Sequence, residues 1–166
     1  MQTVVIYDSK FGNTEKIAEA IGRGAGTLGP VSVAAAGEAS DTLAGRPDLL
    51  LIGGPTQKHG MSPPLATFVD HVHRGTLRGV PVATFDTRYE QSRLLTGSAA
   101  KSAASHLRRT GCRLIAPPES FFVERGSKPP EGGRPDPSAV RLVDGELKRA
   151  RQWGARLASA AATRQA

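Results

Sequence analysis

The sequence predicts an α/β protein in which a parallel sheet of about five strands lies between two layers of helices. Short aliphatic runs recur along the chain, and segments with apolar residues at helical spacing separate them. The length of 166 residues, 17.4 kDa, suits one domain with a substantial core. Strands that alternate with helices pair in parallel through right-handed crossovers, which gives a three-layer sandwich. We therefore expect residues 1–166 to form a single domain.

The expected strands are short runs rich in Val, Ile and Leu. Continuous apolar runs of this kind are typical of parallel strands that are buried on both faces. The runs are residues 3–7, 31–35, 49–53, 80–85 and 113–123, the last of which is interrupted by Pro117 and Pro118.

The expected helices cover the sheet with apolar residues at i, i+3 and i+4. They span about residues 17–28, 64–73, 98–110 and 147–161, with a weaker helix near residues 39–44. The Pro- and Gly-rich residues 126–137 predict a long surface loop before the last helix.

The charge is uneven along the chain. The formal net charge is +7 and the sequence pI is about 10.2, a balance that often accompanies nucleic-acid binding. Residues 1–87 contain seven Lys and Arg against eight Asp and Glu, whereas residues 88–166 contain fifteen against seven. The basic residues of the second half are scattered among acidic ones, and no basic stripe interleaved with aromatic residues, of the kind that stacks bases, is visible. We interpret the excess as a solvated basic face rather than a nucleic-acid site.

Cysteine usage and hydropathy favour a cytoplasmic protein. The single cysteine, Cys112, cannot form an internal disulfide, and the sequence opens on a strand without a basic and apolar leader. The longest aliphatic run, residues 49–52, is far too short to cross a bilayer, so no membrane partner is expected.

The stretch DSKFGNTEK, residues 8–16, joins the first expected strand to the first expected helix. A turn of small residues at this place can point several backbone amides into one cavity, which makes a cradle for an anion. Ser9, Asn13 and Thr14 add side-chain donors, and Gly12 allows the backbone to curl close to a ligand. The alternative is a tight turn before a well-capped helix, which explains the same residues without any ligand.

A second loop, GGPTQKHGMSPP, occupies residues 53–64 after the third expected strand. Its glycines and prolines restrict its shape and leave backbone groups free to grip a flat ring by the edge. The alternative is an irregular surface connection in which Pro63 and Pro64 begin a helix. Because parallel sheets bind ligands at the carboxyl ends of their strands, we expect a site built from the loops after strands one, three and four.

The titratable residues predict neither a metal site nor a catalytic residue. His71, His73 and His106 have only Asp70 as a nearby carboxylate, which is not a recognisable pattern of metal ligands. No candidate nucleophile has a partnered base in the sequence.

Residues 9–14, SKFGNT, resemble the phosphate loop of flavodoxin-like domains, usually written T/S-x-T-G-x-T. The loop over residues 54–64 is similar to the one that flanks the flavin in that family. With the alternation of strands and helices, the resemblance covers nearly the whole chain and implies a flavodoxin-like strand order of 2-1-3-4-5. Three further segments are similar to those of small stand-alone flavodoxin-domain proteins: residues 84–88, 96–101 and 117–123.

The resemblance implies FMN as the cofactor. The phosphate would lie on the first loop, and the ring would lie between the second loop and the residues after the fourth strand. Gly60 is the candidate for the peptide beside the flavin N5 atom, because glycine tolerates the backbone angles needed there. The implied cofactor-binding residues are Ser9, Lys10, Phe11, Gly12, Asn13, Thr14, Pro55, Thr56, Gln57, Lys58, His59, Gly60, Asp86, Thr87, Arg88 and Tyr89.

Two features depart from the usual pattern of the family. Phe11 stands where the family usually has a hydroxyl, which removes one contact to the phosphate. The only tryptophan, Trp153, lies in the last expected helix, so Tyr89 is the aromatic residue placed to reach the flavin. The alternative for Tyr89 is an exposed loop tyrosine.

Basic residues near the ring would make the flavin easier to reduce than in acidic flavodoxins. One unit charge about 6 Å from the reduced ring is worth about 2–3 kcal/mol at an effective dielectric constant of about 20, or roughly 100 mV for one electron. For Arg88 the alternative is a structural salt bridge with Asp86 or Glu90. The basic candidates are Lys58, His59, Arg88 and Arg93.

We expect an FMN-binding protein that acts in electron transfer with a redox partner protein or a small-molecule electron acceptor. Whether the chain is an enzyme stays open. One alternative is an FMN-dependent quinone-type reductase. A second is a binding module that has kept the flavodoxin fold, has lost the flavin and binds a partner through its basic second half.

Overall fold

The computed structural model describes residues 1–39, 45–57, 59–72, 77–91, 97–125 and 140–163. The strands are β1 (Thr3–Tyr7), β2 (Val31–Ala35), β3 (Leu49–Pro55), β4 (Pro81–Tyr89), β5 (Arg113–Leu114), β6 (Glu119–Arg125) and β7 (Val140–Leu142). The α-helices are α1 (Asn13–Ala25), α2 (Pro63–His71), α4 (Ala99–Arg109) and α5 (Glu146–Ala162). Two 3-10 helices, η1 (Gly26–Leu28) and η2 (Ala36–Glu38), flank β2.

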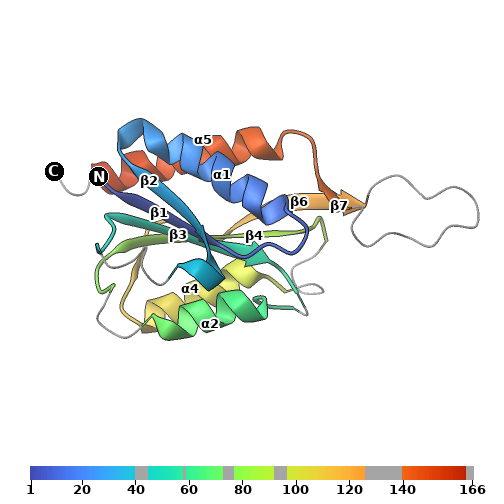
Figure 1. Cartoon of the computed structure of the whole chain (residues 1–166), viewed down its shortest axis with the longest axis horizontal. Helices are drawn as coiled ribbons and strands as arrows, with labels where there is room; N and C mark the ends of the chain where they lie inside the picture. The colour runs from blue at the N-terminus through green and yellow to red at the C-terminus, as the bar shows by residue number, and fades with distance from the viewer. Residues whose placement is uncertain (40–44, 58, 73–76, 92–96, 126–139, 164–166) are drawn as a thin grey trace, which may run out of the picture.

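The strands form one sheet in the order β2-β1-β3-β4-β6-β7, between α1 and α5 on one face and α2 and α4 on the other (Figure 1). The expected three-layer α/β sandwich with a flavodoxin-like strand order is therefore confirmed. The described sheet has seven strands rather than five, for two reasons. The fifth expected strand is split at its prolines into β5 and β6, which both pair in parallel with β4. In addition, β7 pairs antiparallel with β6 at the edge.

Strand β2 differs from the expectation that every strand is buried on both faces. It pairs with β1 alone and so lies at the edge of the sheet. The Val33 side chain is 39% exposed. An edge strand has a neighbour on one side only, so an apolar run does not by itself ensure burial.

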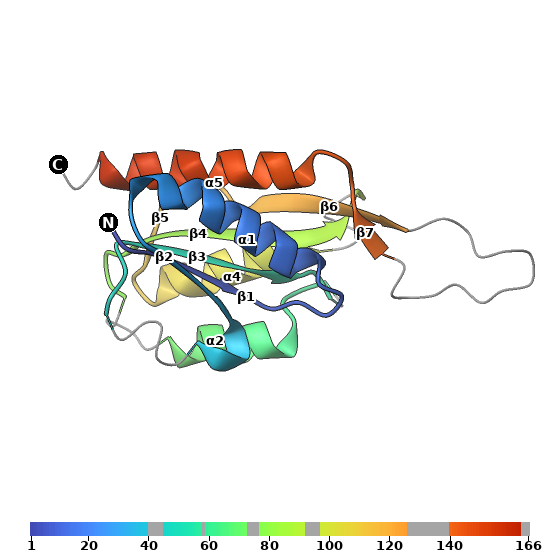
Figure 2. The ribbon, with the colours of Figure 1, turned by 45° about the horizontal axis from the view of Figure 1, so that its top comes forward.

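Two apolar clusters hold the helices against the sheet. Residues of alternate parity along each strand face opposite layers: Val5 and Leu51 lie in the cluster under α1 and α5, while Val4 and Leu50 lie in the cluster over α2 and α4. The helices stand on the two faces of the sheet in both views (Figures 1 and 2). This arrangement leaves the carboxyl ends of β1, β3 and β4 open at one end of the sheet.

Trp153 belongs to the core beneath α5. Its ring makes edge contacts with Phe85 and Phe121, at centroid distances of 6.2 and 6.0 Å. Phe85 and Phe121 also contact each other at 6.3 Å. Each buried aromatic residue of this kind contributes about 2–3 kcal/mol by burial. The only tryptophan therefore stabilises the fold.

Helices α1 and α5 approach each other so closely that their backbones touch. A Cβ atom at Gly24 of α1 would overlap the carbonyl oxygen of Arg151, and one at Gly154 of α5 would overlap that of Ile21. Glycine at these two positions permits the approach, and the pair is seen side by side in Figure 2. Helix α1 therefore rests on α5 as well as on the sheet.

The remaining expectations divide between the described residues and those outside them. The helix expected at residues 98–110 is α4, whose N-cap Ser98 accepts a hydrogen bond from the Lys101 amide at 3.2 Å. The weaker helix expected near residues 39–44 and the loop over residues 126–137 lie outside the described residues, except for Ala39. In the described part of the chain, no helix has the length and apolar character needed to cross a membrane.

Candidate functional site

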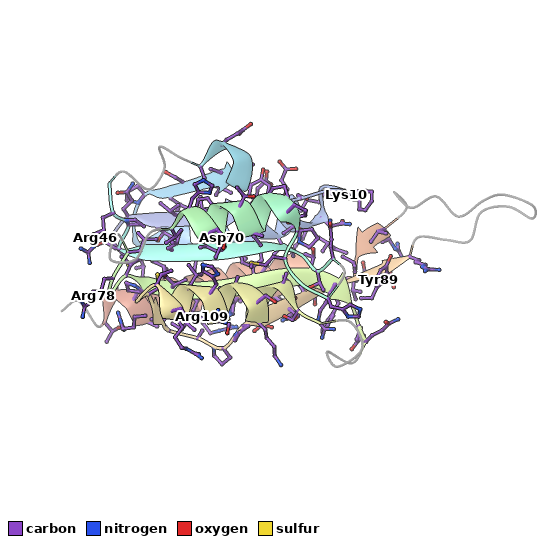
Figure 3. The ribbon with its side chains drawn as sticks, turned by 90° about the horizontal axis from the view of Figure 1, so that it is seen from below. Lys10, Arg46, Asp70, Arg78, Tyr89 and Arg109 are labelled. Carbon is purple, nitrogen blue, oxygen red and sulfur yellow. The ribbon has the colours of Figure 1, made fainter. Side chains whose placement is uncertain are left out.

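A cavity of about 360 Å³ opens where the carboxyl ends of β1, β3 and β4 meet. Figure 3 labels Lys10 and Tyr89, both of which line it, at the same end of the sheet. The position agrees with the rule that parallel sheets bind ligands at this end. The lining residues are Ser9, Lys10, Phe11, Asn13, Thr14, Pro55, Thr56, Gln57, His59, Thr87, Arg88, Tyr89, Val123 and Val140.

The β1 loop, residues 8–12, presents polar groups that the protein does not satisfy. The Ser9 hydroxyl oxygen is buried and has no hydrogen-bond partner among the described residues. Gly12, the N-cap of α1, has φ 77°, and no side chain caps the first turn of the helix. A helix begun in this way presents free amides and the positive end of its dipole, an arrangement suited to an anion.

Asn13 and Thr14, the expected side-chain donors, form hydrogen bonds within the protein and do not cap α1. The Asn13 side-chain amide donates to the carbonyl oxygen of Val140 at 2.8 Å, which ties the start of α1 to β7. The hydroxyls of Thr14 and Thr87 share a hydrogen bond of 2.7 Å, which ties it to β4. Both side chains line the cavity and fix the position of its walls.

Tyr7 holds the base of the β1 loop. Its hydroxyl donates to Oε1 of Glu15 at 2.9 Å, which links the end of β1 to the first turn of α1. Burial, followed by the hydrogen bond to Glu15 and the repulsion from its charge, raises the pKa of Tyr7 to about 12. The hydroxyl therefore stays protonated and keeps this link near neutral pH.

The β3 loop, residues 56–62, contains a tight turn. The Gln57 amide donates to the carbonyl oxygen of Gly60 at 3.0 Å, and the Gly60 amide donates back to Gln57 at 2.8 Å. His59 occupies the left-handed region with φ 72°. Gly60, the candidate for the peptide beside the flavin N5 atom, does not line the cavity, and its amide is engaged within the turn. Lys58 lies outside the described residues.

Asp86 lies behind the cavity wall and anchors the β3 loop to α4. The carboxylate is fully buried, and its Oδ2 accepts from the Thr56 hydroxyl at 3.0 Å, the Ser98 hydroxyl at 2.6 Å and the Ala100 amide at 3.2 Å. The Thr56 hydroxyl in turn accepts from the Ala99 amide at 3.0 Å. Asp86 therefore positions Thr56, which does line the cavity.

Arg88 and Tyr89 end β4 in different environments. Arg88 is 8% exposed, and its guanidinium donates to the Ser120 hydroxyl at 3.1 Å and to the Gln91 carbonyl at 2.6 Å. The salt bridge with Asp86 that the sequence left open is not formed among the described residues: Oδ2 of Asp86 accepts from Thr56, Ser98 and Ala100, and its buried Oδ1 has no hydrogen-bond partner there. Tyr89 is 37% exposed at the mouth of the cavity.

The mouth also carries Phe11, which is 45% exposed, with the Lys10 ammonium 5.3 Å from its ring centroid. Phe11 and Tyr89 thus place two aromatic rings at the opening. Among the described side chains, no group of three or more His, Cys, Asp and Glu is arranged to hold a metal ion.

The structure brings together most of the residues that the sequence singled out. Twelve of the sixteen line the cavity, while Gly12, Gly60 and Asp86 support it and Lys58 is not described. Sequence reasoning missed Val123 and Val140. Val123 could have been found as the carboxyl-terminal part of the fifth expected strand. Val140 carried no signal, because the strand that holds it is short and follows a long Pro- and Gly-rich stretch.

A comparison with protein families gives one match: the flavodoxin family model matches residues 5–118. No curated protein matches the chain.

Solved structures with the same fold include a flavodoxin from the domain Archaea, at a TM-score of 0.73 and 22% identity, covering 98% of this chain and 99% of the other. Flavodoxin 1 from Bacillus cereus has a TM-score of 0.72 and 17% identity, with 96% and 98% covered. A flavodoxin, WrbA-like protein from Agrobacterium tumefaciens has a TM-score of 0.70 and 22% identity, with 98% of both chains covered. At these identities the likeness concerns the fold.

Proposed function

Because the chain belongs to the flavodoxin family, whose members bind FMN and transfer electrons, we propose that it is an FMN-dependent electron carrier that serves a redox partner protein. One observation above all supports this function. The cavity at the carboxyl ends of the strands contains a buried Ser9 hydroxyl that has no partner among the described residues, beside the start of α1, which no side chain caps. A phosphate group of the cofactor would supply the acceptors that these donors lack.

The β1 loop fits the phosphate end of FMN. The φ of 77° at Gly12 turns the chain so that α1 starts at the cavity, and a Cβ atom at Gly12 would meet nothing within 4 Å. The space beside Gly12 is therefore open. The Ser9 hydroxyl and the amides of the first turn of α1 would hold the phosphate, and Lys10 adds a positive charge.

The rest of the cavity fits the flavin ring. Phe11, Tyr89, Val123 and Val140 provide an aromatic and aliphatic lining, while Thr56 and Gln57 provide polar groups. A flat ring with one polar edge needs this combination of apolar walls and a few oriented hydrogen-bonding groups. The residues present therefore fit FMN, although Phe11 supplies no hydroxyl to the phosphate.

When bound, FMN supplies the redox chemistry, and the protein supplies position and electrostatics. The Asp86 network fixes Thr56 against the cavity, and Asn13 fixes the wall formed by β7. Phe11 and Tyr89 line the cavity and are 45% and 37% exposed, so the site is accessible to a partner from solvent. An accessible mouth is what a carrier needs, because its partner must come close to the cofactor.

Titration with FMN and with riboflavin, which lacks the phosphate, tests this function. Quenching of flavin fluorescence measures both affinities. We expect FMN to bind at least about tenfold more tightly than riboflavin, because several charge-assisted hydrogen bonds to the phosphate are lost with riboflavin. A folded protein that binds neither flavin would instead support a binding module without a flavin.

An FMN-dependent quinone-type reductase is the second candidate. The apolar wall formed by Val123 and Val140 favours it, because a small hydrophobic acceptor could enter the cavity beside the ring. Oxidation of NAD(P)H by the FMN-loaded protein with a quinone would support this reductase. Inertness toward NAD(P)H, together with electron transfer to a partner protein, would support the carrier.

A further inference from the structure

The longest stretch of the sequence without an acidic residue surrounds α4. Between Glu90 and Glu119 there are five Lys and Arg and no Asp or Glu. Residues 147–166 also contain five Lys and Arg and no Asp or Glu, whereas basic and acidic residues are mixed in residues 119–146. Helix α4 lies in the middle of this stretch, on the face of the sheet that it shares with α2 (Figure 3).

A shallow hollow of about 400 Å³ lies on the outer side of α4. Lys101, Ser105 and Arg109 are four residues apart and form one exposed line along the helix, and Ser102 and His106 form a parallel line beside it. The opposite side of the helix is apolar and buried against the sheet. The hollow, which we call the α4 hollow, therefore presents positive charges beside the exposed Ser105 hydroxyl, and its lining residues are Lys101, Ser102, Ser105, His106 and Arg109.

The positive charge of the α4 hollow is not neutralised within the described part of the molecule. Its one ion pair there joins His106 Nδ1 to Oδ1 of Asp70 at 3.5 Å. Lys101 and Arg109 form no ion pair with any described residue. Arg78 extends the basic surface beyond the end of α4. Its side chain lies beside Gly111, where a hypothetical Cβ atom would be 3.5 Å from the Arg78 Cγ atom. Figure 3 shows Arg78 and Arg109 on this face.

The α4 hollow adjoins the β3 loop. A Cβ built at Gly60 would lie 3.8 Å from the Ser102 hydroxyl oxygen. At the start of the same helix, the Ala99 amide donates to the Thr56 hydroxyl, which lines the cofactor cavity. A protein seated on the α4 hollow would therefore touch the loop that forms the edge of the cofactor site.

We propose that the α4 hollow is the docking site for an acidic redox partner protein. This inference depends on the electron-carrier function proposed above and names the chemistry of the partner. Carboxylates of the partner pair with Lys101 and Arg109 and accept a hydrogen bond from Ser105, since the Ser102 hydroxyl already donates to the carbonyl oxygen of Ser98 at 3.1 Å. Unpaired charges of one sign guide an oppositely charged protein to the right orientation and speed its association.

The chemistry of the α4 hollow favours a protein over a nucleic acid or a lipid surface. The hollow contains no aromatic side chain on which a base could stack. It has no exposed apolar side chain to insert into a bilayer. Its cations alternate with hydroxyls over a single helix, which suits the carboxylates of a folded partner surface.

The test measures direct binding of an acidic [2Fe–2S] ferredoxin by isothermal titration calorimetry at low and at physiological salt. The variant Lys101→Gln/Arg109→Gln removes two charges from the α4 hollow. The control Arg151→Gln/Arg156→Gln removes two exposed charges from α5, on the opposite face of the sheet. Each exposed ion pair contributes little by itself, so we expect the loss of both charges in the α4 variant to weaken binding roughly tenfold. The control charges lie away from the α4 hollow, so the control should weaken binding less than about twofold.

Binding is measured with the cofactor-free and the FMN-loaded protein, and FMN retention is followed separately by absorbance. Failure of the proposed docking site can therefore be distinguished from failure of the proposed FMN binding. Circular dichroism checks that both variants fold. The proposal is overturned if the wild-type protein does not bind the ferredoxin at low salt, or if the two variants weaken binding equally. It is also overturned if duplex DNA or phosphatidylserine vesicles bind more tightly than the ferredoxin through Lys101 and Arg109.

Discussion

The two loops that line the cofactor cavity differ in how their polar groups are satisfied. In the β3 loop, Gln57 and Gly60 hydrogen-bond to each other, and Thr56 is held between Asp86 and Ala99. In the β1 loop, the Ser9 hydroxyl is buried without a partner among the described residues, and α1 begins without a side-chain cap. The β3 loop is therefore held largely by its own hydrogen bonds, although its buried Ser62 hydroxyl has no partner among the described residues, whereas the β1 loop combines the unpartnered Ser9 hydroxyl with an uncapped helix start.

This difference assigns separate roles to the two loops. A loop whose hydrogen bonds are internal keeps its shape without a ligand and can orient one. Buried donors without acceptors lower the stability of the ligand-free protein, and a ligand that supplies the acceptors gains binding free energy from them. Loss of a hydrogen-bonding group that supports the β3 loop should therefore change stability, and loss of the unpartnered hydroxyl in the β1 loop should change ligand affinity.

The variant Asp86→Ala should have the largest effect. It leaves the hydroxyls of Thr56 and Ser98 and the Ala100 amide without their shared acceptor. Since each buried donor without an acceptor costs about 1–3 kcal/mol, we expect the free energy of unfolding to fall by about 3 kcal/mol. Urea denaturation of the cofactor-free protein measures it. Asp86→Asn, which keeps one acceptor oxygen, should lose less. If the Ala variant were as stable as the wild type, the β3 loop would not depend on this carboxylate.

Ser9→Ala should weaken FMN binding roughly tenfold, or about 1.4 kcal/mol, through the loss of one charge-assisted hydrogen bond. The stability of the cofactor-free protein should change by less than about 0.5 kcal/mol, because the Ser9 hydroxyl has no partner to lose among the described residues. Fluorescence titration and urea denaturation measure the two quantities. Riboflavin affinity is the control and should not change. Equal losses for FMN and riboflavin would place the hydroxyl away from the phosphate.

Gly12→Ala should lower the free energy of unfolding by about 1 kcal/mol. The backbone at Gly12 has φ 77°, where side chains other than glycine are strained. A new Cβ would meet nothing within 4 Å, so the loss would come from the backbone angle and not from a clash. Gly12→Asn should recover part of it, because asparagine tolerates this region better than alanine. Equal stability of the Ala and Asn variants would contradict the explanation.

The smallest effect is expected for the pH dependence that Tyr7 contributes. Its folded-state pKa of about 12 lies above the ordinary value of 10.0, so protonated Tyr7 favours the folded state. This contribution is complete below about pH 10 and is lost as the pH rises from 10 to 12. Solvent screening should keep it below about 1 kcal/mol.

The free energy of unfolding from pH 9 to 12 should therefore fall more steeply for the wild type than for Tyr7→Phe. If the two curves were parallel over this range, the bond between Tyr7 and Glu15 would not stabilise the base of the β1 loop.

The sequence contained enough information to predict the layered fold and both loops. Aliphatic runs that alternate with segments of helical spacing predict the layers, the resemblance to flavodoxin-like domains implies the strand order, and the positions of Gly12 and Pro55 after two of those runs locate the cavity. These are local signals, because each comes from a short contiguous segment. They do not depend on knowing which side chains meet in space.

Other features depend on contacts between distant segments and could not be predicted in this way. Asp86 follows an expected strand like a ligand-binding residue, but α4 and the β3 loop satisfy its Oδ2 atom. Val140 reaches the cavity because β7 pairs antiparallel with β6 across a long intervening stretch. The hydrogen-bond partner of Arg88 could not be predicted either: its guanidinium donates to the hydroxyl of Ser120 in β6.

The backbone contact between α1 and α5 has a consequence for how the protein folds during translation. Gly24 and Gly154 bring together two helices that are far apart in the chain, and α1 carries the uncapped start that faces the cavity. A nascent chain can form β1 and α1 early, but their outer support is absent until α5 emerges. Flavin capture during translation should therefore wait for nearly the whole polypeptide.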